Sequence, residues 1–227
     1  MDAIYDDMQE RSKQLTLTNH PTIHDENDPE RCLAIYSLLN HYNIELTPFG
    51  GQLFKHLSQI EETFAYQPGS GLHITWFQLQ QMGKTHICHP GVYNSILHEH
   101  IPKLLNITIR FERLCLTKNS LVALGYVDTN ETYVNEWRDS LRAELTESAI
   151  PYDEPYKSDL IHCTLIRFAN RPPSTTTIHF LRIIEQIRIH LFTAHIDRVD
   201  TGYGSWHMLA HQLQPCLTKS LSSEHLF

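Results

Sequence analysis

The sequence of 227 residues has no long hydrophobic run, and its apolar stretches end after four or five residues, as in 121–124. A membrane-spanning helix needs about 20 consecutive apolar residues, so we expect no membrane contact. The opening residues, MDAIYDDMQER, are acidic and lack the hydrophobic stretch of a secretory signal. These two absences predict a cytoplasmic protein.

Cysteine pairs and an excess of basic charge are also missing. The five cysteines are an odd number and include no C-x-x-C pair, which argues against a disulfide framework and against a cysteine zinc site. The 18 basic residues against 26 acidic ones give a net charge of −8, so the basic surface typical of proteins that bind long nucleic acids is absent. A small nucleotide or a short oligonucleotide in a local pocket remains compatible with this charge.

Two histidines, by contrast, stand in a repeated pattern. The segments LHITW at 72–76 and IHCTL at 161–165 both read apolar–His–x–Thr–bulky, and both lie in segments predicted to be strands. Because side chains alternate across a strand, the His and the Thr of each segment face the same side. If the two strands lie side by side, two imidazoles and two hydroxyls share one polar pocket.

Such a pocket suits cleavage of a phosphoester without a metal. One neutral histidine takes a proton from water or a ribose hydroxyl, and the other, protonated, gives a proton to the leaving oxygen. The ordinary histidine pKa of about 6.5 allows both roles near neutrality. The threonine hydroxyls donate hydrogen bonds to the non-bridging phosphate oxygens. The sequence does not say which histidine is the base.

With HITW at 73–76 and HCTL at 162–165, the chain resembles the 2H phosphoesterase superfamily, whose signature is a pair of H-x-[ST]-x motifs about this far apart. The superfamily includes RNA 2′,3′-cyclic phosphodiesterases, 2′,5′-oligoadenylate phosphodiesterases and phage nucleases that degrade cyclic-oligonucleotide signals. The resemblance implies that no metal and no cofactor are needed. It implies four catalytic residues, namely His73, Thr75, His162 and Thr164. The stretch FQLQQMG after the first motif departs from the usual Phe-x-Gly continuation, so the substrate stays open.

The fold implied by the resemblance is α+β and bilobal, with two antiparallel sheets, outer helices and a central cleft. A single domain is expected over 29–211, after a polar segment at 1–28 and before a flexible tail at 212–227. The apolar spacing predicts helices at 29–41, 47–64, 92–105, 130–145 and 172–191. Alternation and turn residues predict strands at 72–79, 106–116, 120–127, 160–168, 194–199 and 205–209.

Four further residues are candidates for contact with the substrate. Arg167 follows the second motif where the family often has arginine, but its odd offset from His162 would turn it away from the pocket on a regular strand, unless the strand end bends. The aromatic rings of Trp76, Tyr203 and Trp206 are candidates for stacking on a base, with packing in the core as the alternative. The pair His98-Glu-His100 has no second half at metal-site spacing, so we expect surface histidines there.

The favoured hypothesis is a metal-independent phosphodiesterase that acts on a small nucleotide or a short oligonucleotide as a monomer, with no obligatory protein partner. One alternative is a non-catalytic module of the same fold that binds nucleotides or RNA ends. Another is a protein-interaction domain whose histidines are structural. Turnover and nucleotide binding separate the three.

Overall fold

The strands of the protein form one antiparallel sheet. The computed structural model describes residues 6–8, 10–11, 16–18, 32–40, 42–58, 72–80, 89–128, 130, 132–154, 159–168, 174–186, 188–204 and 214–220. The strands are β1 (Cys32–Leu38), β2 (Ile44–Leu46), β3 (His73–Gln80), β4 (Thr108–Leu116), β5 (Ser120–Val127), β6 (Ile161–Arg167), β7 (Arg188–His195), β8 (Arg198–Gly204) and β9 (Gln214–Ser220). Their order in the nine-stranded sheet is β2-β7-β4-β5-β6-β3-β1-β8-β9.

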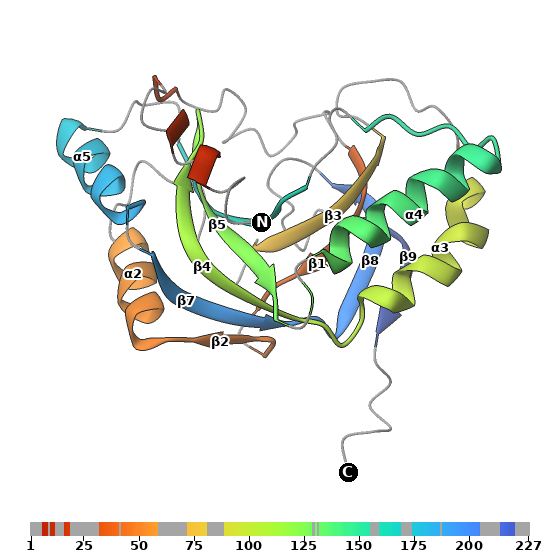
Figure 1. Ribbon diagram of the computed structural model, residues 1–227, viewed down its shortest axis with the longest axis horizontal. Helices are drawn as coiled ribbons and strands as arrows, with labels where there is room; N and C mark the ends of the chain where they lie inside the picture. Colours follow the sequence, from red (N-terminus) through yellow and green to blue (C-terminus); the bar gives the residue numbers. More distant parts are fainter. Residues whose placement is uncertain are drawn as a thin grey trace, which may run out of the picture.

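The helices flank the two arms of this curled sheet (Figure 1). They are α2 (Pro48–Ser58), α3 (Asn94–His100), α4 (Tyr133–Glu147) and α5 (Thr175–Ile184), with short 3₁₀ helices at Pro90–Tyr93 and Ile101–Leu104. Helices α2 and α5 lie outside the arm that contains β4 and β7, and α3 and α4 lie beside β3 on the other arm. None of the helices described is long and apolar enough to cross a lipid bilayer.

The expected bilobal fold with two separate sheets is wrong. Strands β3 and β6, one from each expected lobe, pair antiparallel with Ile74 opposite Cys163. The other edge of β3 pairs with β1, and the other edge of β6 pairs with β5. Buried backbone N–H and C=O groups need partners on both edges of a strand, and here each motif strand supplies some of them to the other. The result is a single sheet curled into an open half-barrel (Figure 1).

The two faces of the sheet carry separate hydrophobic clusters. The large core lies between one face and the helices, where Ile74, Cys163 and Ala123 pack with side chains such as Leu141 of α4. A small cluster lies on the opposite face of β4 and β5. It consists of Cys115, Val122, Leu124 and Tyr126, with Met8 and Leu160 packed against it.

Several predicted elements are confirmed. The hairpin of β4 and β5 turns where the sequence indicates, and the Thr117 N–H donates to the Ser120 carbonyl at 2.8 Å. Strands β3 and β6 fall within two residues of their predicted bounds, and α3 ends beside Pro102 as expected. Helix α4 begins one turn after Asn130, whose Oδ1 accepts the Thr132 N–H at 3.0 Å.

Other elements are corrected. The predicted helix at 29–41 is strand β1. Residues 32–37 are all buried, so both faces of the strand are covered and the alternation that marks a strand is absent. The predicted helix at 172–191 ends at Ile184, and β7 follows it. Part of the expected flexible tail forms β9, paired with β8. The predicted strand at 205–209 lies outside the described residues.

Candidate functional site

The two His-x-Thr motifs meet on neighbouring strands of the sheet. Ile74 of β3 lies opposite Cys163 of β6. Because antiparallel partners run in opposite directions, this register sets His73 beside Thr164, and Thr75 beside His162. All four side chains share one face, opposite to that of Ile74 and Cys163. We call it the site face. The juxtaposition predicted from the repeated motif is therefore present in the fold.

The two ends of this four-residue group differ in exposure. His73 is 7% exposed and Thr164 is 4% exposed. Thr75 and His162, the other directly opposed pair, are half-buried. The His162–Thr75 end is thus the more open to solvent.

Arg167 also reaches the site face, because β6 is irregular. Val122 of β5 lies opposite Thr164, whereas Ser120 lies opposite Arg167, so β6 contains one extra residue between these two pairs. Cross-strand partners share a face, and Ser120 and Val122 share a face by alternation. The bulge therefore turns Arg167 to the side of Thr164. The expectation for a regular strand is wrong here, and the bend at the strand end is the correct alternative.

The surroundings of His162 favour its neutral form. Burial, the largest cause, and the positive charges of Arg167 and Arg138 together lower the pKa of His162 to about 4. The imidazole is therefore uncharged at neutral pH.

Arg138 of α4 is a site residue that sequence reasoning missed. Its guanidinium is buried, and it donates from Nε to the Trp76 carbonyl at 2.8 Å and from Nη2 to the Leu160 carbonyl at 2.9 Å. One side chain thus bridges β3 and the residue that precedes β6. A signal existed, since Arg138 interrupts the apolar stripe of its helix directly after Trp137.

Tyr36 is a second missed residue. It lies opposite Thr75 on one side and opposite Asp200 of β8 on the other, so it belongs to the site face. Burial raises the pKa of the Tyr36 hydroxyl, and the Asp200 carboxylate raises it further. The incorrect helix at 29–41 concealed this placement.

Two of the aromatic candidates face away from the site. Trp76 is buried in the core, where its Nε1 donates to the Ser37 Oγ at 2.9 Å. Tyr203 lies opposite Leu33 and packs against the main core. Trp206 lies outside the described residues. The alternative of core packing therefore describes Trp76 and Tyr203.

Within the part of the chain that the structure describes, no three His, Cys, Asp or Glu side chains are grouped to hold a metal ion. His98 is exposed, as expected. His100 is not a surface residue, because it is 1% exposed and its Nε2 lies 2.6 Å from the Glu144 carboxylate. This contact ties α3 to α4.

No protein-family model matches the sequence, and no curated protein matches it.

Proposed function

We propose that the protein is a metal-independent phosphodiesterase that cleaves a nucleotide phosphodiester with two histidines as general base and general acid. One observation carries this proposal: the register of β3 on β6 puts two His–Thr pairs side by side on one face of the sheet. A face built only for packing would carry apolar side chains at these central positions.

The environments of the residues suggest their roles. His162 is neutral at pH 7 and takes the proton of the attacking water or ribose hydroxyl. His73 then gives a proton to the leaving oxygen. Thr75 and Thr164 donate hydrogen bonds to the non-bridging oxygens, and Arg167 balances their negative charge. Each proton transfer contributes typically about 10²–10⁴-fold to the rate.

The substrate class follows from charge and from the resemblance. A net charge of −8 disfavours long nucleic acids, whose binding depends on many basic contacts. Resemblance to the 2H phosphoesterases through HITW and HCTL points to a 2′,3′-cyclic phosphate, a 2′,5′-oligoadenylate or a cyclic oligonucleotide.

The test is hydrolysis of a panel of these three substrate types by the full chain in the presence of EDTA. We expect turnover of at least one substrate, and a loss of at least about 100-fold in His73→Gln and in His162→Gln. His98→Gln, which changes an exposed histidine on α3, is the matched control and keeps full activity. Activity that EDTA abolishes, or that survives both site substitutions, would falsify the mechanism. Product analysis identifies the nucleophile, because 2′-phosphate and 5′-phosphate products arise from different attacks.

A second candidate function is binding without turnover. It is favoured by the low exposure of His73 and Thr164, 7% and 4%, which leaves little surface for a reacting group. This candidate predicts that the panel ligands raise the melting temperature while none of them is hydrolysed.

A further inference from the structure

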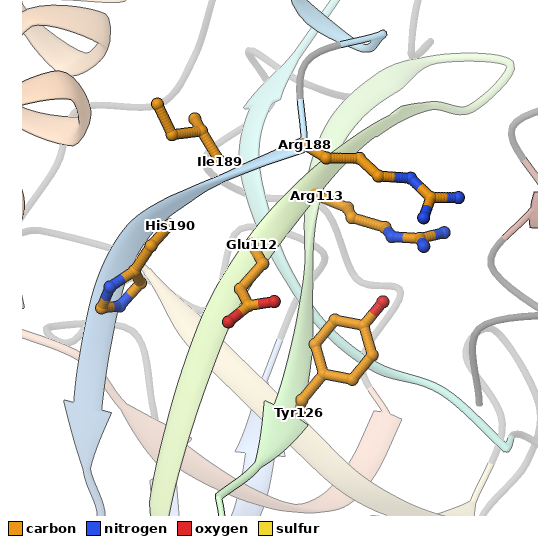
Figure 2. Close-up of a pocket in the computed structure, with 6 residues that line it drawn as sticks. All are labelled: Glu112, Arg113, Tyr126, Arg188, Ile189 and His190. Atoms are coloured by element: carbon orange, nitrogen blue, oxygen red, sulfur yellow. The ribbon is translucent and has the colours of Figure 1, made fainter.

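A cavity of about 310 Å³ opens on the arm of the sheet formed by β4, β5 and β7. Figure 2 shows the side chains that line it. They are Glu112, Arg113, Tyr126, Arg188, Ile189 and His190. In this view the guanidinium groups of Arg113 and Arg188 extend in the same direction, and the Tyr126 hydroxyl points toward them.

The two arginines converge on one carboxylate. Arg113 Nη1 lies 2.9 Å from Asp6 Oδ1, and Arg188 Nη2 pairs with the same oxygen. The Arg113 side chain is only 4% exposed, whereas those of Arg188 and Asp6 are 56% and 51% exposed. A hydrogen bond from Arg113 and the charges of both arginines lower the pKa of Asp6. The pair thus holds an anionic oxygen with guanidinium N–H groups, which are donors that also bind phosphate.

Two other titratable groups of the cavity, Glu112 and His190, have partners of their own. The Glu112 carboxylate lies 3.2 Å from Arg110 Nε, which also pairs with Asp128 at 2.7 Å. His190 Nε2 lies 2.9 Å from the Thr193 hydroxyl. Both guanidinium groups pair with the same Asp6 oxygen, and the repulsion between two neighbouring positive charges favours an anion beside them.

The cavity lies on the same face of the sheet as the catalytic candidates. Arg113 is opposite Leu124 of β5, and Leu124 is opposite His162 of β6. Two strand spacings separate the backbones of Arg113 and His162, which is about 10 Å. Met8, near Asp6 in the sequence, packs on the cluster that contains Leu124. A ligand bound both at the two His–Thr pairs and beside Arg113 and Arg188 would extend over this distance of about 10 Å along one face of the sheet.

We propose that Arg113 and Arg188 form a phosphate-binding subsite, which the Asp6 carboxylate fills when no ligand is bound, and that it takes a second phosphate group of an oligonucleotide substrate. The anion site stands on its own residues, whereas its use by the substrate rests on the proposed function. A substrate with one phosphate would leave Asp6 in place, and a substrate with two phosphates would displace it.

The anion site is tested by titrating the full chain with inorganic phosphate at low ionic strength in a calorimeter. Asp6→Asn removes the resident charge, and we expect it to bind phosphate about tenfold more tightly than the unchanged chain, the equivalent of one charge-assisted hydrogen bond. Adding Arg188→Gln to Asp6→Asn reverses this gain. Adding Arg182→Gln, which changes an exposed arginine on α5, is the matched control and preserves the tighter binding of phosphate.

Two outcomes overturn the anion site. One is the same phosphate affinity in all variants, and the other is the same loss of affinity from Arg188→Gln as from Arg182→Gln. Arg188 is exposed, so its substitution spares the fold, and near-ultraviolet circular dichroism checks this.

The use of the subsite by a substrate is tested with a dinucleotide that carries a terminal phosphate and with the same dinucleotide without it. We expect Arg188→Gln to raise KM about tenfold for the phosphorylated form alone. Phosphate binding that depends on Asp6 and Arg188, together with equal KM values for the two dinucleotides, assigns the pocket to free phosphate and overturns the substrate part of the proposal. Phosphate binding of the expected kind with no hydrolysis of any panel member contradicts the proposed function and leaves the anion site intact.

Discussion

At the scale of single residues, the candidate site shows which side chains a sequence can place. The four motif residues could be predicted, because the alternation of a strand fixes the relation between positions i and i+2 locally. Arg167 could be predicted as a candidate, but not the face on which it lies, since the bulge that turns it depends on the pairing of β6 with β5. The place of Arg138 in the apolar stripe of its helix was visible in the sequence, but its partners, the carbonyls of two distant segments, were not.

The protonation of His162 is the first prediction at this scale. We expect a side-chain pKa of about 4, measured by NMR titration of the imidazole. Because the Arg167 charge contributes to this low pKa, Arg167→Gln raises it toward the ordinary value of about 6.5. Arg182→Gln leaves it unchanged. A pKa near 6.5 in the unchanged chain contradicts the described surroundings of His162.

The same histidine makes stability depend on pH. The folded pKa of about 4 lies below the unfolded value of about 6.5, so the unfolded chain binds more protons between these values. The contribution of neutral His162 is fully present above pH 6.5 and is lost as the pH falls toward 4. Urea unfolding at pH 7.5, 5.5 and 4.5 measures this decline, which His162→Gln makes shallower and His98→Gln does not.

At the scale of elements, a buried arginine holds the two motif strands together. Beyond the pair Ile74–Cys163, the Arg138 guanidinium bonds the carbonyls of Trp76 and Leu160. Helix α4 thereby fixes the position of β3 relative to β6, and so the distance between the two His–Thr pairs. The sequence predicted both strands and the helix, but the element that joins them is a long-range contact.

We expect Arg138→Met to lower the free energy of unfolding by roughly 3 kcal/mol, because it removes charged donors from two carbonyls and leaves them unsatisfied. Urea denaturation measures the loss. The exposed Arg182→Met serves as the control and stays within about 0.5 kcal/mol of the unchanged chain. A loss no larger than that of the control would show that Arg138 does not join the strands.

Two adjacent glycines of α2 give a sharper contrast. A Cβ at Gly50 would lie 1.9 Å from the Leu191 carbonyl oxygen, a backbone atom of β7, whereas a Cβ at Gly51 meets nothing within 4 Å. Gly50→Ala should therefore destabilise the protein by about 2 kcal/mol or more. Gly51→Ala should stabilise it by about 0.5–1 kcal/mol, because alanine favours the helix. Thermal unfolding of the two variants checks both signs, and similar melting temperatures would contradict the packing of α2 on β7.

At the scale of the whole molecule, the sequence indicated most of the helices and strands but not how the strands pair. The hairpin of β4 and β5 is local and was predictable from its turn. The single sheet depends on the pairing of β3 with β6, and on β1, which is buried on both faces and lacks a strand signature. The helical spacing in 172–191 continues past Ile184 into β7, because short apolar runs fit a helix and a buried strand equally well.

The proposed activity requires His73 and His162 to act as one unit on a phosphodiester. The most direct measurement is kcat/KM for the best panel substrate in His73→Gln, His162→Gln and the double variant, with EDTA present. We expect each single change to cost at least about 100-fold, and the double variant to lose little more than the worse single one, because acid and base serve the same step. Losses that multiply in the double variant, or single variants that keep their activity, would contradict the account.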